Sequence, residues 1–208
     1  MKAILPIVAA GLAVAALAQA PPASRTFHNP LGFSYAIPPD WETVDYSAQA
    51  KEQARQGATT EDAKKGLQCV QMGLMARHGS PSSVIVEVAL PFECFGQTMT
   101  NADLPGFAAG ASQGLRQNFD LGAPTLGEYT LGKHDFWIER ASGTMKQNPS
   151  ATYTVEIACT VAQKAAVCWM TMAADPLALS AFESGMVSLD GEPPAPLVPG
   201  NAFDKKPS

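Results

Sequence analysis

Two carboxylates stand inside otherwise apolar stretches, which makes them the first candidates for chemistry. Glu87 interrupts the run SVIVEVAL, and Glu156 interrupts YTVEIACTV. An acid buried among apolar side chains has a raised pKa, which would suit a polar contact inside a ligand cleft. The structural alternative is that each acid pairs with an arginine, such as Arg77 or Arg140, or faces a partly solvated side of a sheet. We prefer this alternative, because buried charges are usually paired.

The three histidines are widely spaced and fall in predicted loops: His28, His78 and His134. A metal or catalytic histidine needs further ligands or partners close to it. His134-Asp135 could form a carboxylate–histidine site with Glu87 or Glu93, but no feature of the sequence brings these residues together. We therefore predict neither a metal site nor a catalytic histidine.

Motifs for the familiar reactions are missing from the sequence. Residues 110–114 read GASQG, which has the GxSxG spelling, but they fall inside the predicted helix 101–119 and not at the strand-to-helix turn that a nucleophile motif requires. The sequence contains no SxxK nucleophile motif, no HExxH zinc motif and no Walker or dinucleotide-binding glycine loop. It also lacks a CxxC pair, the pattern of thioredoxin-like redox sites and zinc ribbons. We assign no catalytic, cofactor-binding or metal-binding residue, expect no cofactor, and favour a non-enzymatic protein.

Four cysteines allow two disulfides, and one pairing follows from strand register. Residues 153–161 and 166–173 are typical of two strands joined by the tight turn AQKA. If this turn is symmetric, Cys159 lies opposite Cys168 and the apolar faces of the two strands coincide. Opposed Cα atoms can be about 4.5 Å apart, which a disulfide spans. The alternative is two reduced cysteines that act as small core residues.

The other two cysteines, Cys69 and Cys94, flank a second predicted hairpin formed by residues 67–76 and 83–90. Cys94 falls a few residues beyond the point opposite Cys69, so a bridge requires a bulge or a bend. Whether this pair forms a disulfide stays open at the level of sequence.

The N-terminus has the layout of a secretory signal peptide, which we place at residues 1–18. A short basic start precedes an apolar run that ends in the small-x-small sequence Ala16-Leu17-Ala18, so we expect cleavage before Gln19. A cut after Ala20 also fits, but it would leave Pro21 at the new N-terminus. The run is too short for an uncleaved anchor, since a span needs roughly 20 residues. We expect an exported protein, periplasmic or secreted, with no stable membrane insertion.

The charge of the chain bears on its partners. The full sequence has a net charge of −5, and removal of Lys2 with the signal leaves 13 basic and 19 acidic residues, a net charge of −6. Nucleic-acid binding requires a basic patch, and anionic membranes attract basic segments. We therefore exclude nucleic acid as a partner and expect an unidentified protein or a small apolar ligand.

Predicted strands come in pairs, with predicted helices between the pairs. The strand pairs are 33–37 with 41–44, 67–76 with 83–90, 125–131 with 136–142, and 153–161 with 166–173. The helices are 47–65, broken at Gly57, then 101–119, and a last one from Asp175 with a buried stripe of Leu179, Phe182, Met186 and Leu189. This order predicts an α+β fold, a single antiparallel sheet of about six strands covered by helices.

The domain boundaries follow from composition. Residues 19–26 are expected to be a linker, residues 27–190 a single α+β domain, and residues 191–208 a disordered, Pro-rich tail.

The segment GFSYAIPPDW, at Gly32 to Trp41, resembles the opening hairpin of the PsbP-like proteins. Similar too is the later order: a strand that ends in Thr130-Leu131-Gly132, aromatic strands, a two-strand hairpin and a last amphipathic helix. The resemblance spans roughly residues 27–190 and implies an α/β/α sandwich. The family includes extrinsic photosystem subunits, small-GTPase partners and exported bacterial proteins. No functional residue of the family can be placed in this sequence.

Two functional hypotheses follow. The preferred one is an exported, non-enzymatic accessory or binding protein, PsbP-like, whose partner the sequence does not identify. The alternative is a binder or carrier of a small apolar ligand in a pocket between the sheet and the helix at 101–119. The methionines Met170, Met172 and Met186 are expected to be core residues first and an adaptable binding surface second. An enzyme with an unfamiliar site comes third, and we assign no residues to it.

Overall fold

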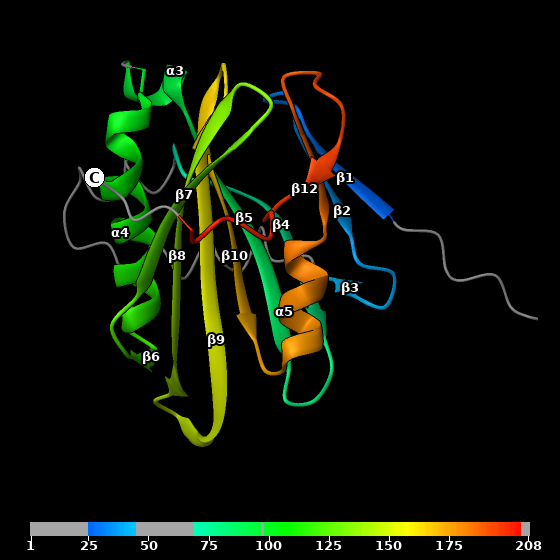
Figure 1. Ribbon diagram of the computed structural model, residues 1–208, viewed down its shortest axis with the longest axis vertical. Coiled ribbons are helices and arrows are strands. Elements are labelled where there is room, and N and C mark those ends of the chain that lie inside the picture. Colours follow the sequence, from blue (N-terminus) through cyan, green and yellow to red (C-terminus); the bar gives the residue numbers. More distant parts are fainter. Residues whose placement is uncertain (1–24, 45–68, 97, 205–208) are drawn as a thin grey trace, which may run out of the picture.

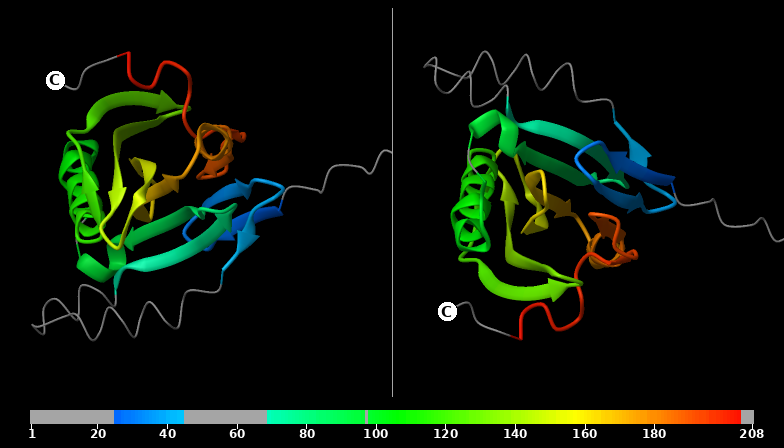
Figure 2. Two further views of the ribbon diagram at one scale, coloured as in Figure 1. Left: turned by 90° about the horizontal axis from the view of Figure 1, so that it is seen from below. Right: turned by 90° about the horizontal axis from the view of Figure 1, so that it is seen from above.

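The computed structural model describes residues 25–44, 69–96 and 98–204. It is a mixed α/β structure in which strands predominate, built from a large curved sheet, a small sheet and a few helices (Figure 1). The large sheet lies between helix α4 on one side and the small sheet with helix α5 on the other (Figure 2).

The large sheet has eight antiparallel strands in the order β3-β4-β5-β10-β9-β8-β6, with β7 also paired to β8. Its strands are β3 Glu42–Thr43, β4 Gln71–His78, β5 Ser83–Pro91, β6 Phe119–Leu121, β7 Thr125–Leu131, β8 His134–Met145, β9 Asn148–Val161 and β10 Ala165–Ala173.

The small sheet has four antiparallel strands in the order β1-β2-β11-β12. Its strands are β1 Arg25–Asn29, β2 Phe33–Ile37, β11 Met186–Leu189 and β12 Ala195–Pro196. The helices are α3 Phe92–Phe95, the 3-10 turn η1 Asn101–Asp103, α4 Leu104–Arg116 and α5 Pro176–Glu183.

Each face of the large sheet carries its own apolar core, because side chains alternate between the two faces of a strand. The core toward the small sheet includes Phe33, Phe136 and Trp169, with Trp169 fully buried. The core toward α4 includes Ile157 and Met170. The central strand β10 is buried along almost its whole length, as expected for a strand covered on both faces.

The hairpin of β9 and β10 has the register that the sequence predicts. Cys168 pairs with Cys159 and Met170 with Ile157, so the two cysteines lie directly opposite each other on the α4 side. The second and third predicted hairpins, β4 with β5 and β7 with β8, also form.

A single six-stranded sheet was the wrong prediction: the strands divide into an eight-stranded and a four-stranded sheet. The first predicted hairpin explains part of the difference. Strand β2 pairs with β1 and β11, whereas β3 pairs with β4 in the other sheet. The prolines before Trp41 therefore mark a crossover between sheets instead of a hairpin turn. Trp41 is buried and stacks on His78 of β4, which fixes this crossover.

The last predicted helix is too long, since α5 ends at Glu183 and residues Met186–Leu189 form strand β11. Helix and strand both place apolar residues on one side over so short a span, so the pattern alone does not separate them. The backbone at Gly185 packs against the Tyr35 hydroxyl, leaving no room for a side chain there. The chain then pairs Val187 with Tyr35 of β2, which extends the small sheet.

The disorder prediction for the Pro-rich tail is wrong for residues 191–204. Leu197 is fully buried, and Val198 and Ala202 are nearly so. Backbone bonds hold the segment: Leu197 N–H donates to Gly185 O at 2.9 Å, and the Tyr129 hydroxyl donates to Leu197 O at 2.8 Å. Composition suggested disorder, but these few apolar side chains find a site in the core.

The signal peptide at 1–18, most of the linker at 19–26, the helices at 47–65 and the last four residues lie outside the described residues. The first strand begins at Arg25, inside the expected linker. Within the described part of the chain, every helix is too short or too polar to cross a bilayer.

Candidate functional site

A pocket lies where the N-terminal end of α4 meets strands β7 and β8. It has a volume of about 580 Å³ and is lined by Asn101, Ala102, Leu104, Pro105, Glu128, Tyr129, Thr130, Asp135, Phe136 and Trp137. Helix and sheet both contribute to its wall, which is the general position predicted for a ligand pocket. Its lining is half polar, which does not match the apolar character that the sequence analysis expected.

Local sequence fixes the helical side of this pocket. The Thr100 hydroxyl and backbone N–H both donate to the Asp103 carboxylate, forming a capping box at the start of η1. Pro105 occupies the first turn of α4, where a missing N–H costs nothing. Leu104 and Ala108 are buried and anchor the helix to the sheet. The pocket wall is therefore held by a capped and packed helix end.

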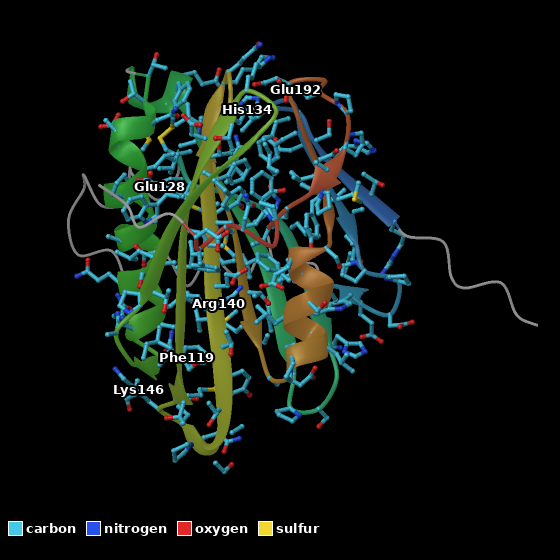
Figure 3. All side chains as sticks on the ribbon, viewed as in Figure 1. Phe119, Glu128, His134, Arg140, Lys146 and Glu192 are labelled. Carbon is cyan, nitrogen blue, oxygen red and sulfur yellow. A yellow bond between two sulfur atoms is a disulfide. The ribbon has the colours of Figure 1, made fainter. Side chains whose placement is uncertain are left out.

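The strand side of the pocket is organised by Asp135. Its carboxylate accepts a hydrogen bond from the Thr130 hydroxyl at 2.9 Å and another from the Asn101 side-chain amide at 2.7 Å. Asp135 thus ties the turn of β7 and β8 to η1. Glu128, labelled in Figure 3 and half-buried on β7, is the second carboxylate of the lining. The lining residues include no basic side chain. The pocket is accordingly electronegative, with Trp137 as its half-buried aromatic wall.

Glu87 lies on β5, fully buried between the two sheets. One of its oxygens accepts a hydrogen bond from the Asn29 side chain of β1 at 3.3 Å, and the other has no partner among the described groups. Burial raises the pKa of Glu87 to about 8, against the opposing effect of the Asn29 hydrogen bond. Gly73 packs directly against the carboxyl group. Glu87 therefore links two sheets, and no described pocket opens onto it.

Glu156 pairs with an arginine, which is the alternative that the sequence analysis preferred for the two buried acids. It is fully buried on β9 and accepts a hydrogen bond from Arg140 Nε at 2.5 Å. Arg140 also pairs with Glu183 of α5, and its guanidinium lies 4.3 Å from the centre of the Phe203 ring. Burial raises the pKa of Glu156 to about 7, although the charge and hydrogen bond of Arg140 oppose the rise. This network joins the large sheet to α5 and the C-terminal segment.

The three histidines lie in strands and not in the predicted loops, because each stands at or near the end of a strand, where sequence separates strand from turn poorly. His28 is exposed on β1. His78 stacks on Trp41 beside a pocket of about 320 Å³. His134 is buried at the start of β8. Among the described residues, no group of three or more His, Cys, Asp or Glu side chains is arranged to hold a metal ion.

Both cysteine pairs lie at disulfide distance. Cys159 and Cys168 are fully buried, with Cα atoms 4.1 Å apart. Cys69 and Cys94 are 5.6 Å apart between Cα atoms, and Cys94 is exposed. The bend needed for the second pair is supplied by the short helix α3 after β5.

Of the methionines considered as a binding surface, Met170 and Met172 lie in the core toward α4, whereas Met186 is 40% exposed on β11. The sequence analysis did not bring Asn101, Thr130 and Asp135 together in a pocket, and it considered Asp135 only beside His134. The available signals were the Thr-x-x-Asp cap that begins at Thr100 and the turn that carries Thr130 and Asp135. The sequence does not show that these two segments touch.

Comparison with known proteins finds similarity among solved structures. Neither the protein-family models nor the curated proteins yield a match to this chain. Among solved structures, the chain is similar to the solution structure of cyanobacterial PsbP (CyanoP) from Synechocystis sp. PCC 6803, with a TM-score of 0.45 and 9% sequence identity, over 79% of this chain and 91% of that chain. This solved structure bears the name of the family that the segment from Gly32 to Trp41 resembles in sequence. At this level of similarity it carries nothing about ligand or partner.

Proposed function

We propose that this protein is an exported, non-enzymatic accessory protein that binds a partner at the pocket between α4, β7 and β8. The observation that carries the proposal is the electronegative lining of this pocket, with Glu128 and Asp135 beside Trp137. Carboxylates and an indole ring together recognise a cationic group, through charge pairing and cation–π contact. The partner is accordingly expected to present a lysine or arginine side chain.

The overall charge supports the same choice of partner. The net charge is −5, and opposite charge on a partner speeds encounter and favours correct orientation. Asp135 is held by Asn101 and Thr130, so its position is fixed before binding. A carboxylate with two hydrogen bonds still has lone pairs free for a cation.

A titration followed by amide NMR shifts tests this binding site. A tri-lysine peptide is expected to shift the amides of Glu128, Thr130 and Asp135, and a tri-glutamate peptide is expected to leave them unchanged. The double variant Glu128→Gln, Asp135→Asn should weaken the tri-lysine response, whereas the exposed Glu93→Gln, outside the pocket, should not. Equal amide shifts in the two variants would show that the tri-lysine peptide does not bind through the carboxylates of this pocket.

Export is tested separately by mass spectrometry of the mature chain from its own cells. We expect the chain to begin at Gln19 and to contain no free thiol at Cys159 or Cys168. Two cysteine pairs at disulfide distance support this expectation, because disulfides persist in oxidising compartments. An intact Met1, or alkylation of Cys159 without denaturant, would contradict it.

A second candidate function is the binding of a small apolar ligand. It is favoured by a cleft of about 290 Å³ whose wall includes Leu131, Val187, Leu189 and Pro193. This cleft lies between the two sheets rather than beside α4. Extraction of the purified protein with organic solvent, followed by mass spectrometry, would reveal a retained ligand. A Leu131→Trp variant that fills the cleft should lose it, and absence of any extracted ligand would count against this function.

A further inference from the structure

Four side chains of the proposed binding pocket stand at the corners of one small area of the β7–β8 pair. Glu128 lies directly opposite Trp137, and Thr130 lies directly opposite Asp135. Residues two apart on a strand point to the same face of a sheet, so all four side chains share one face. This is the face toward α4, because Trp137 packs with the core on that side. The four side chains therefore form the strand wall of the pocket.

The two carboxylates occupy opposite corners of this area. Glu128 is the diagonal neighbour of Asp135, not its direct cross-strand partner. Diagonal neighbours in a sheet stand about 7–8 Å apart. An ammonium group donates from one nitrogen, whereas a guanidinium group carries five N–H donors spread over a planar fork. The diagonal spacing therefore suits the fork, which can donate to both carboxylates at once.

The polar hydrogens at this wall already have acceptors within the protein. The Thr130 hydroxyl donates to Asp135 at 2.9 Å, and the Asn101 amide donates to the same carboxylate at 2.7 Å. Trp137 Nε1 donates to Glu139 Oε1 at 3.3 Å. A ligand thus meets mainly acceptor oxygens and the face of an indole ring. This set suits a ligand that brings several donors of its own.

The indole ring adds a preference for a planar cation. Its hydrogen bond to Glu139 fixes its orientation, and Glu139 is itself only 9% exposed. A guanidinium group can lie flat on an aromatic face while its edge donates to carboxylates. An ammonium group has no flat face to stack, so it gains less from the same ring. Trp137 therefore favours guanidinium over ammonium.

The other charges near this wall do not reverse the preference. Lys133, two residues before Asp135, has its Nζ atom 3.6 Å from Glu192 Oε1 and pairs with that carboxylate. The N-terminus of α4 is the positive end of a helix dipole, which disfavours any cation beside it. This effect acts on ammonium and guanidinium alike, so it lowers the affinity for both without selecting between them.

We propose that this pocket selects a guanidinium group over an ammonium group, with Glu128 and Asp135 as its two acceptors and Trp137 as its stacking face. The inference rests on the proposed function and narrows it, because the partner then presents an arginine side chain. Asn101 and Thr130 are positioning residues that hold the Asp135 carboxylate.

An NMR titration of the full mature chain with three small probes tests this selection. The probes are the Nα-acetyl amides of arginine, lysine and citrulline, the last of which keeps the planar shape of arginine without its charge. The arginine probe should shift the amides of Glu128 and Asp135 and bind about tenfold more tightly than the lysine probe, the scale of one charge-assisted hydrogen bond. The citrulline probe should leave these amides unchanged.

The possible failures of this test are distinguishable. Equal affinities for the arginine and lysine probes would overturn the selection and leave the proposed function standing. No shift at Glu128 and Asp135 with either cationic probe would overturn both the selection and the proposed cation-binding pocket.

A pair of matched variants tests the diagonal arrangement itself. Glu128→Gln keeps the size of the side chain and removes one of the two charges, so the arginine probe should bind no more tightly than the lysine probe. Glu93→Gln, at an exposed site on α3 outside the pocket, should keep the tenfold preference. A preference for arginine that is unchanged in Glu128→Gln would overturn the proposal.

Discussion

At the scale of single residues, the two buried glutamates of the large sheet differ in what neutralises them. Glu156 has the guanidinium of Arg140 within hydrogen-bond distance, whereas Glu87 has only the Asn29 amide. Burial of an unpaired carboxylate is costly, so Glu87 is expected to be protonated in the folded protein over much of the neutral range.

Glu87→Gln is predicted to change the pH dependence of stability. The pKa of Glu87 is raised from 4.5 to about 8 in the folded protein, so the folded state holds the proton more tightly than the unfolded chain. Its contribution is then fully present below about pH 4.5 and is lost as the pH rises toward 8. Glu87→Gln should match the unsubstituted protein in acid and exceed it in alkali, by on the order of 5 kcal/mol at most.

Urea unfolding at a series of pH values measures this difference. The contribution of Glu156 to stability also falls as the pH rises, because its pKa is raised too. The comparison must therefore be made between the variant and the unsubstituted protein at each pH. Glu93→Gln, at an exposed site, serves as the control and should give no pH-dependent difference. A constant gap between Glu87→Gln and the unsubstituted protein across the pH range would contradict a protonated Glu87.

Arg140→Met is predicted to destabilise the fold strongly. It leaves the buried Glu156 without a cation and releases both Glu183 and the Phe203 ring. Loss of one partner of a buried pair costs about 3 kcal/mol or more. The matched control is Arg77→Met, because Arg77 pairs with Glu42 at the exposed surface, where a pair contributes about 0–1 kcal/mol. Similar losses of stability in the two variants, measured by thermal unfolding, would show that the contacts of Arg140 with Glu156, Glu183 and Phe203 do not stabilise the fold.

At the scale of elements, the two cysteine pairs should differ in how easily they are reduced: the Cys159–Cys168 pair of the β9–β10 hairpin should resist reduction, and the Cys69–Cys94 pair should not. Mild reduction without denaturant is predicted to release the thiols of Cys69 and Cys94 first, because Cys94 is exposed while Cys159 and Cys168 are fully buried. Replacing both buried cysteines by alanine should cost about 2 kcal/mol, because the loop they close is short. Alkylation with mass mapping identifies the order, and prior release of Cys159 would contradict it.

The segment after β11 is predicted to be part of the core. Leu197→Ala should destabilise the protein by about 2–4 kcal/mol, because Leu197 is fully buried and its truncation leaves a cavity. Leu177→Ala is the control: this leucine is 83% exposed on α5, and the expected change is within about 0.5 kcal/mol. Equal unfolding midpoints for the two variants would mean that this segment is dispensable for the fold.

How far sequence predicts these elements depends on how local their determinants are. The register of Cys159 and Cys168 follows from one short turn and two apolar faces, and it was predicted correctly. Strand β11 and the ordered segment around Leu197 depend on partners far away in sequence, Tyr35 and Tyr129. The pocket at Asp135 likewise requires the contact with Asn101, which no local pattern reveals.

At the scale of the whole molecule, a large sheet with a core on each face has the proposed binding pocket at one end of α4. The capped helix, the tied Asp135 and the two cysteine pairs give that pocket a rigid support. Rigid support lowers the cost of binding, since few groups must be ordered when the partner arrives. The proposed role as an exported accessory protein combines this pocket with the predicted signal peptide.

The most direct test places a photo-crosslinking residue at Ala102, in the wall of the pocket, within the full chain expressed in its own cells. A discrete crosslinked product is predicted, and the double variant Glu128→Gln, Asp135→Asn should abolish it. The same probe at Leu177, exposed on α5, should give no such product. Crosslinks of equal yield from both positions, or a product at Ala102 that survives the loss of both carboxylates, would contradict a partner bound through this pocket.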